Sequence, residues 1–213
     1  MTINKFAIAD VTPGKLNALV KNIMSQTGIN DPNEAVRLVN FGEWTLVRQA
    51  RTWREQDGVI YFSVTSDGTT GEQWIERLES KGHRISEYAK SILRSQEFKP
   101  TSDIIYEIAV LKGELFNDKD RVTTKIRQEA KDCQLGTPNV EIACLIREKF
   151  SNKELKEMGL YWIVIMHEPI KDSYGDPILL NVGRGDVGSW LNAYYDDPDT
   201  EWDRDDGFAF VVS

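Results

Sequence analysis

Residues 160–170 read LYWIVIMHEPI, and this stretch decides the fold that we expect. The residues from Leu160 to Met166 are all apolar or aromatic, with a β-branched segment in the middle. A continuous apolar run of this kind is typical of a strand that is buried on both faces. We therefore expect residues 160–170 to form a central strand around which the domain is built.

Upstream of this stretch, the chain alternates between strand and helix patterns. WTLVRQARTW at 44–53 and GVIYFSVTS at 58–66 are rich in β-branched and aromatic residues, and REQDG between them is typical of a hairpin. EQWIERLES at 72–80 has helical periodicity, and Thr69 and Glu72 have the spacing of a capping box at its start. The remaining elements expected here are a helix at 86–95 and a strand at 102–113.

A helical block and a final group of strands are expected on either side of the central strand. The block consists of helices at 120–132, 139–150 and 152–159. ILLNV at 178–182 and GFAFVVS at 207–213 are the strands that follow. This order predicts one α+β domain over residues 41–213, with its two ends brought together in a sheet.

An N-terminal helical appendage is expected before this domain, over residues 1–40. Apolar residues recur at helical intervals within 13–27, and Pro13 suits the first turn of a helix. A second short helix is expected at 33–41. Such a pair of helices suits packing or self-association, so an oligomer is one expectation.

The chain has 213 residues and a net charge of −8, which is unevenly distributed. From residue 181 to the end, eight acidic residues outnumber two basic ones, so this segment carries −6. Because such a surface repels phosphates, we expect no nucleic-acid partner.

Neither a secretory signal nor a membrane span is expected. The N-terminal residues lack the apolar core of a signal peptide, and no apolar run reaches the roughly 18 residues that cross a bilayer. These patterns favour a soluble, cytoplasmic protein without a membrane span. Delivery to the cell surface by another route stays open.

Residues 183–206, GRGDVGSWLNAYYDDPDTEWDRDD, are expected to form a long loop without regular structure. Its aromatic residues Trp190, Tyr194, Tyr195 and Trp202 are interleaved with acidic ones. Aromatic side chains give rigid contact area and short polar ones give adaptable hydrogen bonds, as in a paratope. A long ordered loop is usually functional, so residues 181–206 are expected to bind a ligand. The alternative is that Trp190 and Trp202 anchor the loop in the core and that the aspartates form a solvated rim.

Metal binding is the natural competitor for this segment. Acidic residues alternate strictly from Asp197 to Asp205, which could bring oxygen ligands together on Ca²⁺. No start within the segment satisfies the glycine and glutamate positions of an EF-hand loop. One exposed strand face would give the same alternation. We therefore expect no cofactor or metal, and Ca²⁺ is the alternative.

The residues that frame this segment resemble a known family. Gly188-Ser189-Trp190 and Gly207-Phe208 resemble the GSW and GF positions near the C-terminus of variable proteins of prokaryotic diversity-generating retroelements. The resemblance implies a C-type-lectin-like fold of the formylglycine-generating-enzyme-like kind. The helices expected from Asp120 to Gly159 are an insertion relative to that fold. The resemblance also implies that error-prone reverse transcription rewrites adenine-containing codons in the terminal segment. Ala209 stands where the family pattern has an arginine.

On this basis, we expect a non-catalytic protein that binds a protein or other macromolecular ligand with cationic or several donor groups. The expected contact residues are Asn192, Tyr194, Tyr195, Asp196, Asp197, Asp199, Trp202, Asp203, Arg204, Asp205 and Asp206. The resemblance supports a fold without catalysis, because no cysteine follows Cys144 to supply the cysteine pair of formylglycine-generating enzymes.

The alternative function is a metal-dependent hydrolase that uses His167, Glu168 and the acidic C-terminal run. His167 follows the expected central strand and precedes a carboxylate, so it could act as a general base. A ring that hydrogen-bonds the adjoining turn is the favoured interpretation, and His83 is expected to be exposed at a helix end. No Ser or Cys has a nucleophile-elbow context, and no phosphate-binding glycine loop is present.

Overall fold

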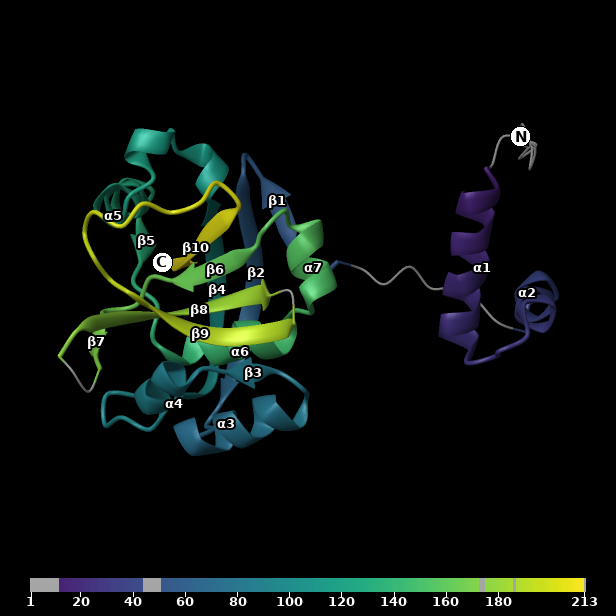
Figure 1. Ribbon diagram of the computed structural model, residues 1–213, viewed down its shortest axis with the longest axis horizontal. Helices are drawn as coiled ribbons and strands as arrows, with labels where there is room; N and C mark the ends of the chain where they lie inside the picture. Colours follow the sequence, from purple (N-terminus) through teal and green to yellow (C-terminus); the bar gives the residue numbers. More distant parts are fainter. Residues whose placement is uncertain (1–11, 44–50, 173–174, 186, 213) are drawn as a thin grey trace. The chain divides into compact units, whose positions relative to one another are not determined.

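The computed structural model describes residues 12–43, 51–172, 175–185 and 187–212, and the chain divides into two compact units, residues 1–51 and 52–213 (Figure 1). The first unit contains α1 (Pro13–Thr27) and α2 (Pro32–Asn40), which contact each other. α1 ends at Gly28, whose φ of 71° gives a left-handed cap, and the Asp31 side chain caps the start of α2. Both helices predicted for the N-terminal appendage are confirmed.

In the second unit, the described residues place ten strands in one mixed sheet, in the order β1-β2-β4-β10-β6-β8-β9-β3, with β5 beside β10 and β7 beside β8. The strands are β1 (Arg54–Gln56), β2 (Val59–Asp67), β3 (Arg84–Ile85), β4 (Ser102–Lys112), β5 (Leu135–Gly136), β6 (Trp162–Ile165), β7 (Ile170–Lys171), β8 (Pro177–Gly185), β9 (Gly188–Tyr195) and β10 (Asp206–Val212). The helices are α3 (Gly71–Ser80), α4 (Glu87–Leu93), α5 (Thr123–Asp132), α6 (Glu141–Lys149) and α7 (Asn152–Glu157), with short 3₁₀ helices η2 (Gly113–Leu115) and η3 (Asp118–Asp120). The predicted α+β class is confirmed.

β6 lies in the interior of this sheet, as the apolar run at 160–166 predicts. It pairs in parallel with β10, where Trp162 lies opposite Asp206, and antiparallel with β8, where Val164 lies opposite Asn181. On its other side β10 pairs with β4, which pairs in turn with β2. β2 and β10 therefore share one sheet with only β4 between them, which confirms that the two ends of the domain meet.

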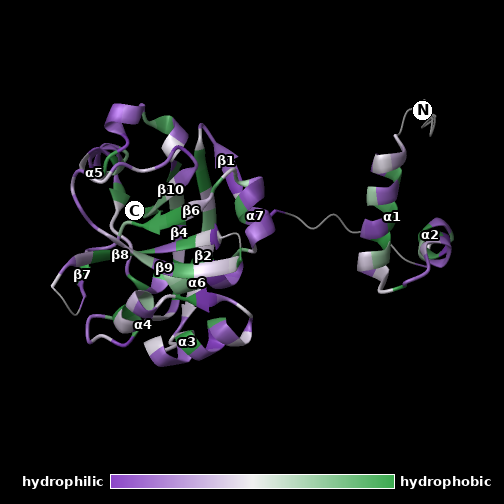
Figure 2. Cartoon of the chain, viewed as in Figure 1, coloured by the Kyte–Doolittle hydropathy of each residue, from purple (hydrophilic) through white to green (hydrophobic). Residues whose placement is uncertain are grey.

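The sheet has an apolar core on each face, because consecutive strand residues point to opposite faces. On one face, Ile163 and Leu180 belong to a core that includes residues of α3, α4 and α6. On the other face, Val164 and Phe208 pack with Ile126 of α5 and with residues of the loop before β10. Figure 2 shows central strands such as β6 largely in green, whereas β1 and helices such as α7 carry much purple. Trp162 of β6 and Asn181 of β8 lie on this second face, with Val164.

β9 corrects the prediction that residues 183–206 form a loop without regular structure. β8 continues to Gly185, and β9 pairs with it antiparallel along its whole length. The strand was hard to recognise from the sequence because Leu191 is its only fully buried side chain. Tyr194, which points to the face opposite Leu191, is exposed. Only residues 196–205 remain as the loop between β9 and β10, and we call them the 196–205 loop.

The first hairpin of the domain is tighter than predicted. β1 occupies residues 54–56, inside the interval that was expected to be the turn. The turn itself is Asp57–Gly58, with φ values of 52° and 78°. Aspartate and glycine adopt this left-handed conformation more readily than other residues, so the pair fixes the turn. Of the strand predicted at 44–53, residues 44–50 lie outside the described part of the chain.

The capping box of α3 lies one residue later than predicted. The Thr70 side chain accepts a hydrogen bond from the Gln73 backbone, and the Gln73 side chain accepts one from the Thr70 backbone. Thr69, the predicted cap, instead donates its hydroxyl to Asp67. Thr69–Glu72 and Thr70–Gln73 both have the spacing of a capping box. Because Thr69 is bonded to Asp67, Thr70 caps the helix.

Gly183 of β8 should not tolerate a side chain, because the Trp162 indole lies against its backbone. A Cβ at this position would lie 1.9 Å from a carbon of the Trp162 ring. We expect Gly183→Ala to lower the free energy of unfolding by about 2 kcal/mol, measured by urea denaturation.

The matched control is Gly185→Ala on the same strand, where the new Cβ would approach the half-buried Trp190 ring at 2.8 Å. A smaller loss is expected, because this approach is less close than the 1.9 Å at Gly183. Equal losses from the two variants would show that the Trp162 contact is not the cause.

Candidate ligand-binding site

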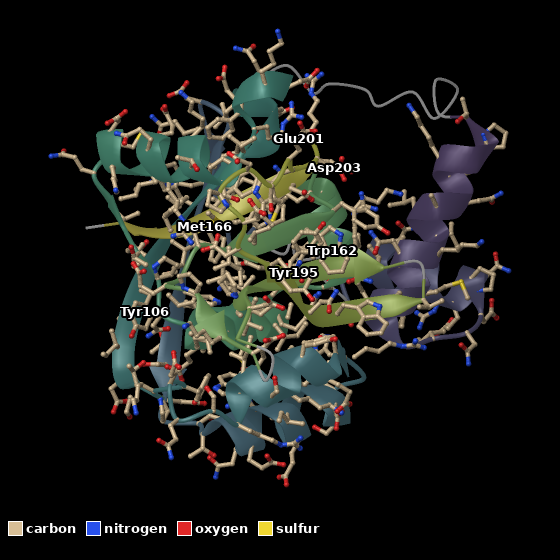
Figure 3. All side chains as sticks on the ribbon, turned by 60° about the vertical axis from the view of Figure 1, so that its left-hand side comes forward. Tyr106, Trp162, Met166, Tyr195, Glu201 and Asp203 are labelled. Atoms are coloured by element: carbon tan, nitrogen blue, oxygen red, sulfur yellow. The ribbon has the colours of Figure 1, made fainter. Side chains whose placement is uncertain are left out.

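A pocket of about 190 Å³ opens beside the 196–205 loop, and we call it the C-terminal pocket. It is lined by Trp162 of β6, Asn181 of β8, Asn192 and Tyr194 of β9, Glu201, Trp202 and Asp203 of the loop, and Asp206 of β10. In Figure 3, Glu201 and Asp203 lie close together on the loop, and Trp162 lies on a strand of the sheet. The lining includes Asn192, Tyr194, Trp202, Asp203 and Asp206 from the expected contact residues.

Strand register places the floor of the pocket on one face of the sheet. Asp206 lies opposite Trp162, and Asn181 lies opposite both Asn192 and Val164. Directly opposed residues in a sheet point to the same face, and so do residues two positions apart on one strand. Side chains from four neighbouring strands therefore reach the same space, although they are far apart in the sequence.

Trp202 fixes the loop that forms the wall of the pocket. Its indole nitrogen donates to the Thr123 hydroxyl at 3.0 Å, and its ring packs 5.3 Å from Tyr194 and 5.8 Å from Phe208. The side chain is 8% exposed, so Trp202 anchors the loop as well as lining the pocket. Trp202 therefore has the position of the core anchor that the alternative described, and its side chain also lines the pocket.

Asp206 is the least solvated carboxyl group of the pocket. It is 5% exposed, and its Oδ2 accepts a hydrogen bond from the Asp203 backbone N–H at 3.1 Å. Within the described residues, its Oδ1 has no hydrogen-bond partner. Burial raises the pKa of Asp206 to about 7, and the nearby charges of Asp203 and Asp205 act in the same direction. This carboxyl group therefore changes its charge near neutral pH.

Asn181 supplies a second buried polar group on the pocket floor. Its side chain is 4% exposed, and its Oδ1 has no partner among the residues that the structure describes. A buried acceptor without a donor is costly, so a native structure usually contains or binds a group that satisfies it. Asn181 and Asp206 thus place two unpartnered acceptors among the residues that line the pocket.

The structure does not bring all the expected contact residues together. Tyr194 and Tyr195 are both exposed, but as neighbours in β9 they point to opposite faces of the sheet, and only Tyr194 lines the pocket. Asp196 forms an ion pair with Arg127 of α5 and is nearly buried, so its position corrects the expectation of a displayed side chain.

The other expected residues lie on the outer part of the loop. Asp197 accepts a hydrogen bond from the Asp199 backbone N–H, which closes a local turn. Arg204 and Asp205 are exposed and do not line the C-terminal pocket. The expected single surface is therefore divided between the pocket and a solvated rim.

Three lining residues were not among the expected contact residues. Trp162 was assigned to a strand buried on both faces, whereas the structure leaves its side chain half-buried at the pocket. Asn181 and Glu201 lie within the expected binding segment but were not singled out. A polar residue in the middle of the apolar run ILLNV was the available signal for Asn181, because buried strands seldom carry unpaired amides.

The acidic residues of the loop do not converge as a metal site would require. In the part of the chain that the structure describes, no group of three or more His, Cys, Asp or Glu side chains is arranged to hold a metal ion. Glu201 instead forms an isolated β-bridge with Val122, which holds the loop against the start of α5.

His167 uses both ring nitrogens in backbone hydrogen bonds. Nδ1 lies 2.6 Å from the Glu168 carbonyl oxygen, and Nε2 accepts from the Leu180 N–H at 3.0 Å. Burial lowers the pKa of His167 to about 4, so the ring is neutral near pH 7. The prediction that this ring hydrogen-bonds the adjoining turn is confirmed, and these contacts leave no free nitrogen for a general base.

His83 differs from its expected exposed position. Its Nδ1 lies 2.7 Å from the Ser189 hydroxyl of β9, and the side chain is half-buried. Burial lowers its pKa. The reason is that β3 pairs with β9, which brings the end of α3 against the sheet.

Comparison with protein-family models, with characterised proteins and with solved structures gives no match to this chain. Among the described residues, no helix is both long enough and apolar enough to cross a membrane.

Arg127 should stabilise the base of the 196–205 loop. It donates to Asp196 Oδ2 at 3.1 Å and to the carbonyl oxygens of Met166 and His167 at 3.2 Å. Arg127→Met would leave a nearly buried carboxylate unpaired, so we expect a loss of about 2 kcal/mol in urea denaturation.

The control for this variant is Arg94→Met, which breaks an ion pair with Glu72 in which both side chains are more than half exposed. Exposed pairs contribute little, so a loss below about 1 kcal/mol is expected. A loss as large as that from Arg127→Met would contradict the anchoring role.

Asp206→Asn should change the pH dependence of stability. Burial raises the folded-state pKa from 3.8 to about 7, so the folded state favours the protonated carboxyl. The free-energy cost of ionising Asp206 in the folded state is absent below pH 3.8. It grows as the pH rises from 3.8 to about 7 and is constant above that. Relative to wild type, the variant should gain at most about 1.4 kcal/mol per pH unit across this window.

Urea denaturation at several pH values measures this difference. Asp57→Asn, in the exposed β1–β2 turn outside the pocket, removes the same charge and is the control for the change in net charge. The same pH dependence in both variants would contradict the raised pKa of Asp206.

Proposed function

We propose that this protein is a non-catalytic ligand-binding protein and that the C-terminal pocket is its binding site. The observation that carries the proposal is a concave site with two buried acceptors, Asn181 Oδ1 and Asp206 Oδ1, that lack a partner within the described residues. Aromatic and short polar side chains line the same space, a combination that suits recognition. A protein or other macromolecular ligand would cover the pocket together with the exposed loop.

We further propose that the segment 181–206 is diversified, as the resemblance to variable proteins of diversity-generating retroelements implies, on a C-type-lectin-like scaffold. Support comes from the location of the framing residues. Gly188–Trp190 begin β9 and Gly207–Phe208 lie in β10, so the frame belongs to regular strands, while much of the intervening loop is exposed. Ala209 stands where the family pattern has an arginine. It is fully buried in β10, between β4 and β6, and this position favours a small residue.

The two helices of the first unit are proposed to mediate self-association. Exposed apolar side chains support this proposal: Leu16, Leu19 and Phe41 are all exposed. Side chains of this kind are commonly covered in oligomers.

Natural sequence variation tests the diversification. Across a natural population of the source, substitutions should concentrate at adenine-containing codons of residues 181–206. Exposed Tyr194 and Asp203 should vary, whereas Trp202 should be constant because the tryptophan codon TGG contains no adenine. Residues 207–212 should be fixed, because they form β10.

Deep sequencing of the coding region measures this pattern, with β6 as the internal control for a constant strand. A segment 181–206 that is as constant as β6 would refute diversification. In that case the pocket would be a site for one fixed ligand.

A further inference from the structure

We infer that the C-terminal pocket takes a primary ammonium group, carried by a small free amine or by a lysine side chain of a partner protein. The inference names the ligand class that the proposed binding site takes with the residues present in this sequence, and it rests on the proposed function. It stands on three features of the pocket: its charge, its aromatic walls and its unpartnered acceptors.

The charge of the pocket favours a cation. Glu201, Asp203 and Asp206 carry carboxyl groups, and no other described lining residue is acidic or basic. The guanidinium of Arg121 acts on Asp206 electrostatically, but it does not line the pocket and donates to backbone carbonyls and to Asp118. A phosphate or carboxylate would meet only like charges here, so anionic ligands are disfavoured.

The aromatic walls suit an ammonium group on an alkyl stem. Trp162, Tyr194 and Trp202 all line the pocket, and the last two rings pack 5.3 Å apart. A cation within about 6 Å of an aromatic ring centre is attracted to the ring face, most strongly to that of tryptophan. The methylene groups next to the ammonium would pack against the same rings, which an inorganic cation cannot do.

The unpartnered acceptors match the donors of an ammonium group. Asp206 Oδ1 and Asn181 Oδ1 are both buried and lack partners within the described residues. An –NH₃⁺ group has three donors and no acceptor, so it can satisfy both oxygens and still donate to Asn192 or Asp203. A divalent metal would require several converging anionic ligands, and no such group exists among the described side chains.

Binding should be linked to the ionisation of Asp206. An ammonium favours the charged carboxylate, so a protonated Asp206 must release its proton when the ligand binds. The affinity should therefore rise as pH increases through about 7. The charged groups around Asp206 are Glu201, Asp203 and Asp205 of the loop and Arg121 before α5, while β6, β8 and β9 present Trp162, Asn181, Asn192 and Tyr194.

Titration of the full chain followed by ¹H–¹⁵N NMR tests the inference. The probes are n-butylammonium chloride, for a free amine, and Nα-acetyl-lysine amide, for a protein lysine. Their neutral counterparts are 1-butanol and Nα-acetyl-norleucine amide. Saturable shifts should appear at the side-chain amides of Asn181 and Asn192 and at the Trp162 indole, with the ammonium probes only.

The comparison of probes has distinct outcomes. Tighter binding of n-butylammonium assigns the group to a small amine, and tighter binding of the lysine derivative assigns it to a protein partner. Equal shifts with the neutral counterparts would overturn the cation assignment but leave the pocket as a binding site. Absence of shifts with all four probes would also overturn it, and natural variation would then decide the proposed function separately.

Two variants make the test specific to Asp206. Asp206→Asn should weaken ammonium binding about tenfold or more and remove the rise of affinity with pH. This variant should fold, because asparagine still accepts the Asp203 N–H and removes a buried charge. Asp57→Asn, in the exposed β1–β2 turn, should bind as wild type does. Equal affinities of wild type and Asp206→Asn across the pH range would overturn the inference.

Discussion

The backbone hydrogen bonds of β10 hold the two parts of the sheet together. β10 pairs with β4 on one side and with β6 on the other, so it joins the β1-β2-β4 part to the β6-β8-β9-β3 part. Space beside it is limited: a Cβ on Gly207 would come within 2.6 Å of Val110. Asp206, the first residue of this strand, is also the most buried charge of the pocket. The candidate site is therefore attached to the strand on which the sheet depends.

The floor of the pocket is held from both faces of the sheet. On the pocket side, the Trp162 ring covers Gly183, and on the opposite side fully buried Arg147 of α6 donates to the Gly183 carbonyl oxygen at 3.0 Å. Arg147 also donates to the carbonyl oxygen of Phe150, and burial lowers its pKa to about 10. Rigid support of this kind lets buried polar groups keep their positions without a ligand, which reduces the entropy lost on binding.

Those parts of the fold that depend on hydrophobic periodicity were predictable from the sequence. The run at 160–166 indicated an interior strand because burial on both faces leaves a local pattern. β9 was missed because its pattern depends on which strand lies beside it, and Gly188 and Asn192 conceal its alternation. The pocket was half predicted: composition indicated Tyr194 and Asp203, but no local signal places Trp162 beside them. That proximity arises from strand register, which is a long-range property.

The central position of β10 has a consequence for synthesis of the protein. Residues 206–212 must leave the ribosome before the two parts of the sheet can join, so the sheet cannot be completed until this strand has been synthesised. A frameshift or premature stop codon upstream of residue 206 would remove this strand. The resulting chains would expose unpaired strand edges and be degraded, so folding itself would act as quality control on the reading frame of the 181–206 segment.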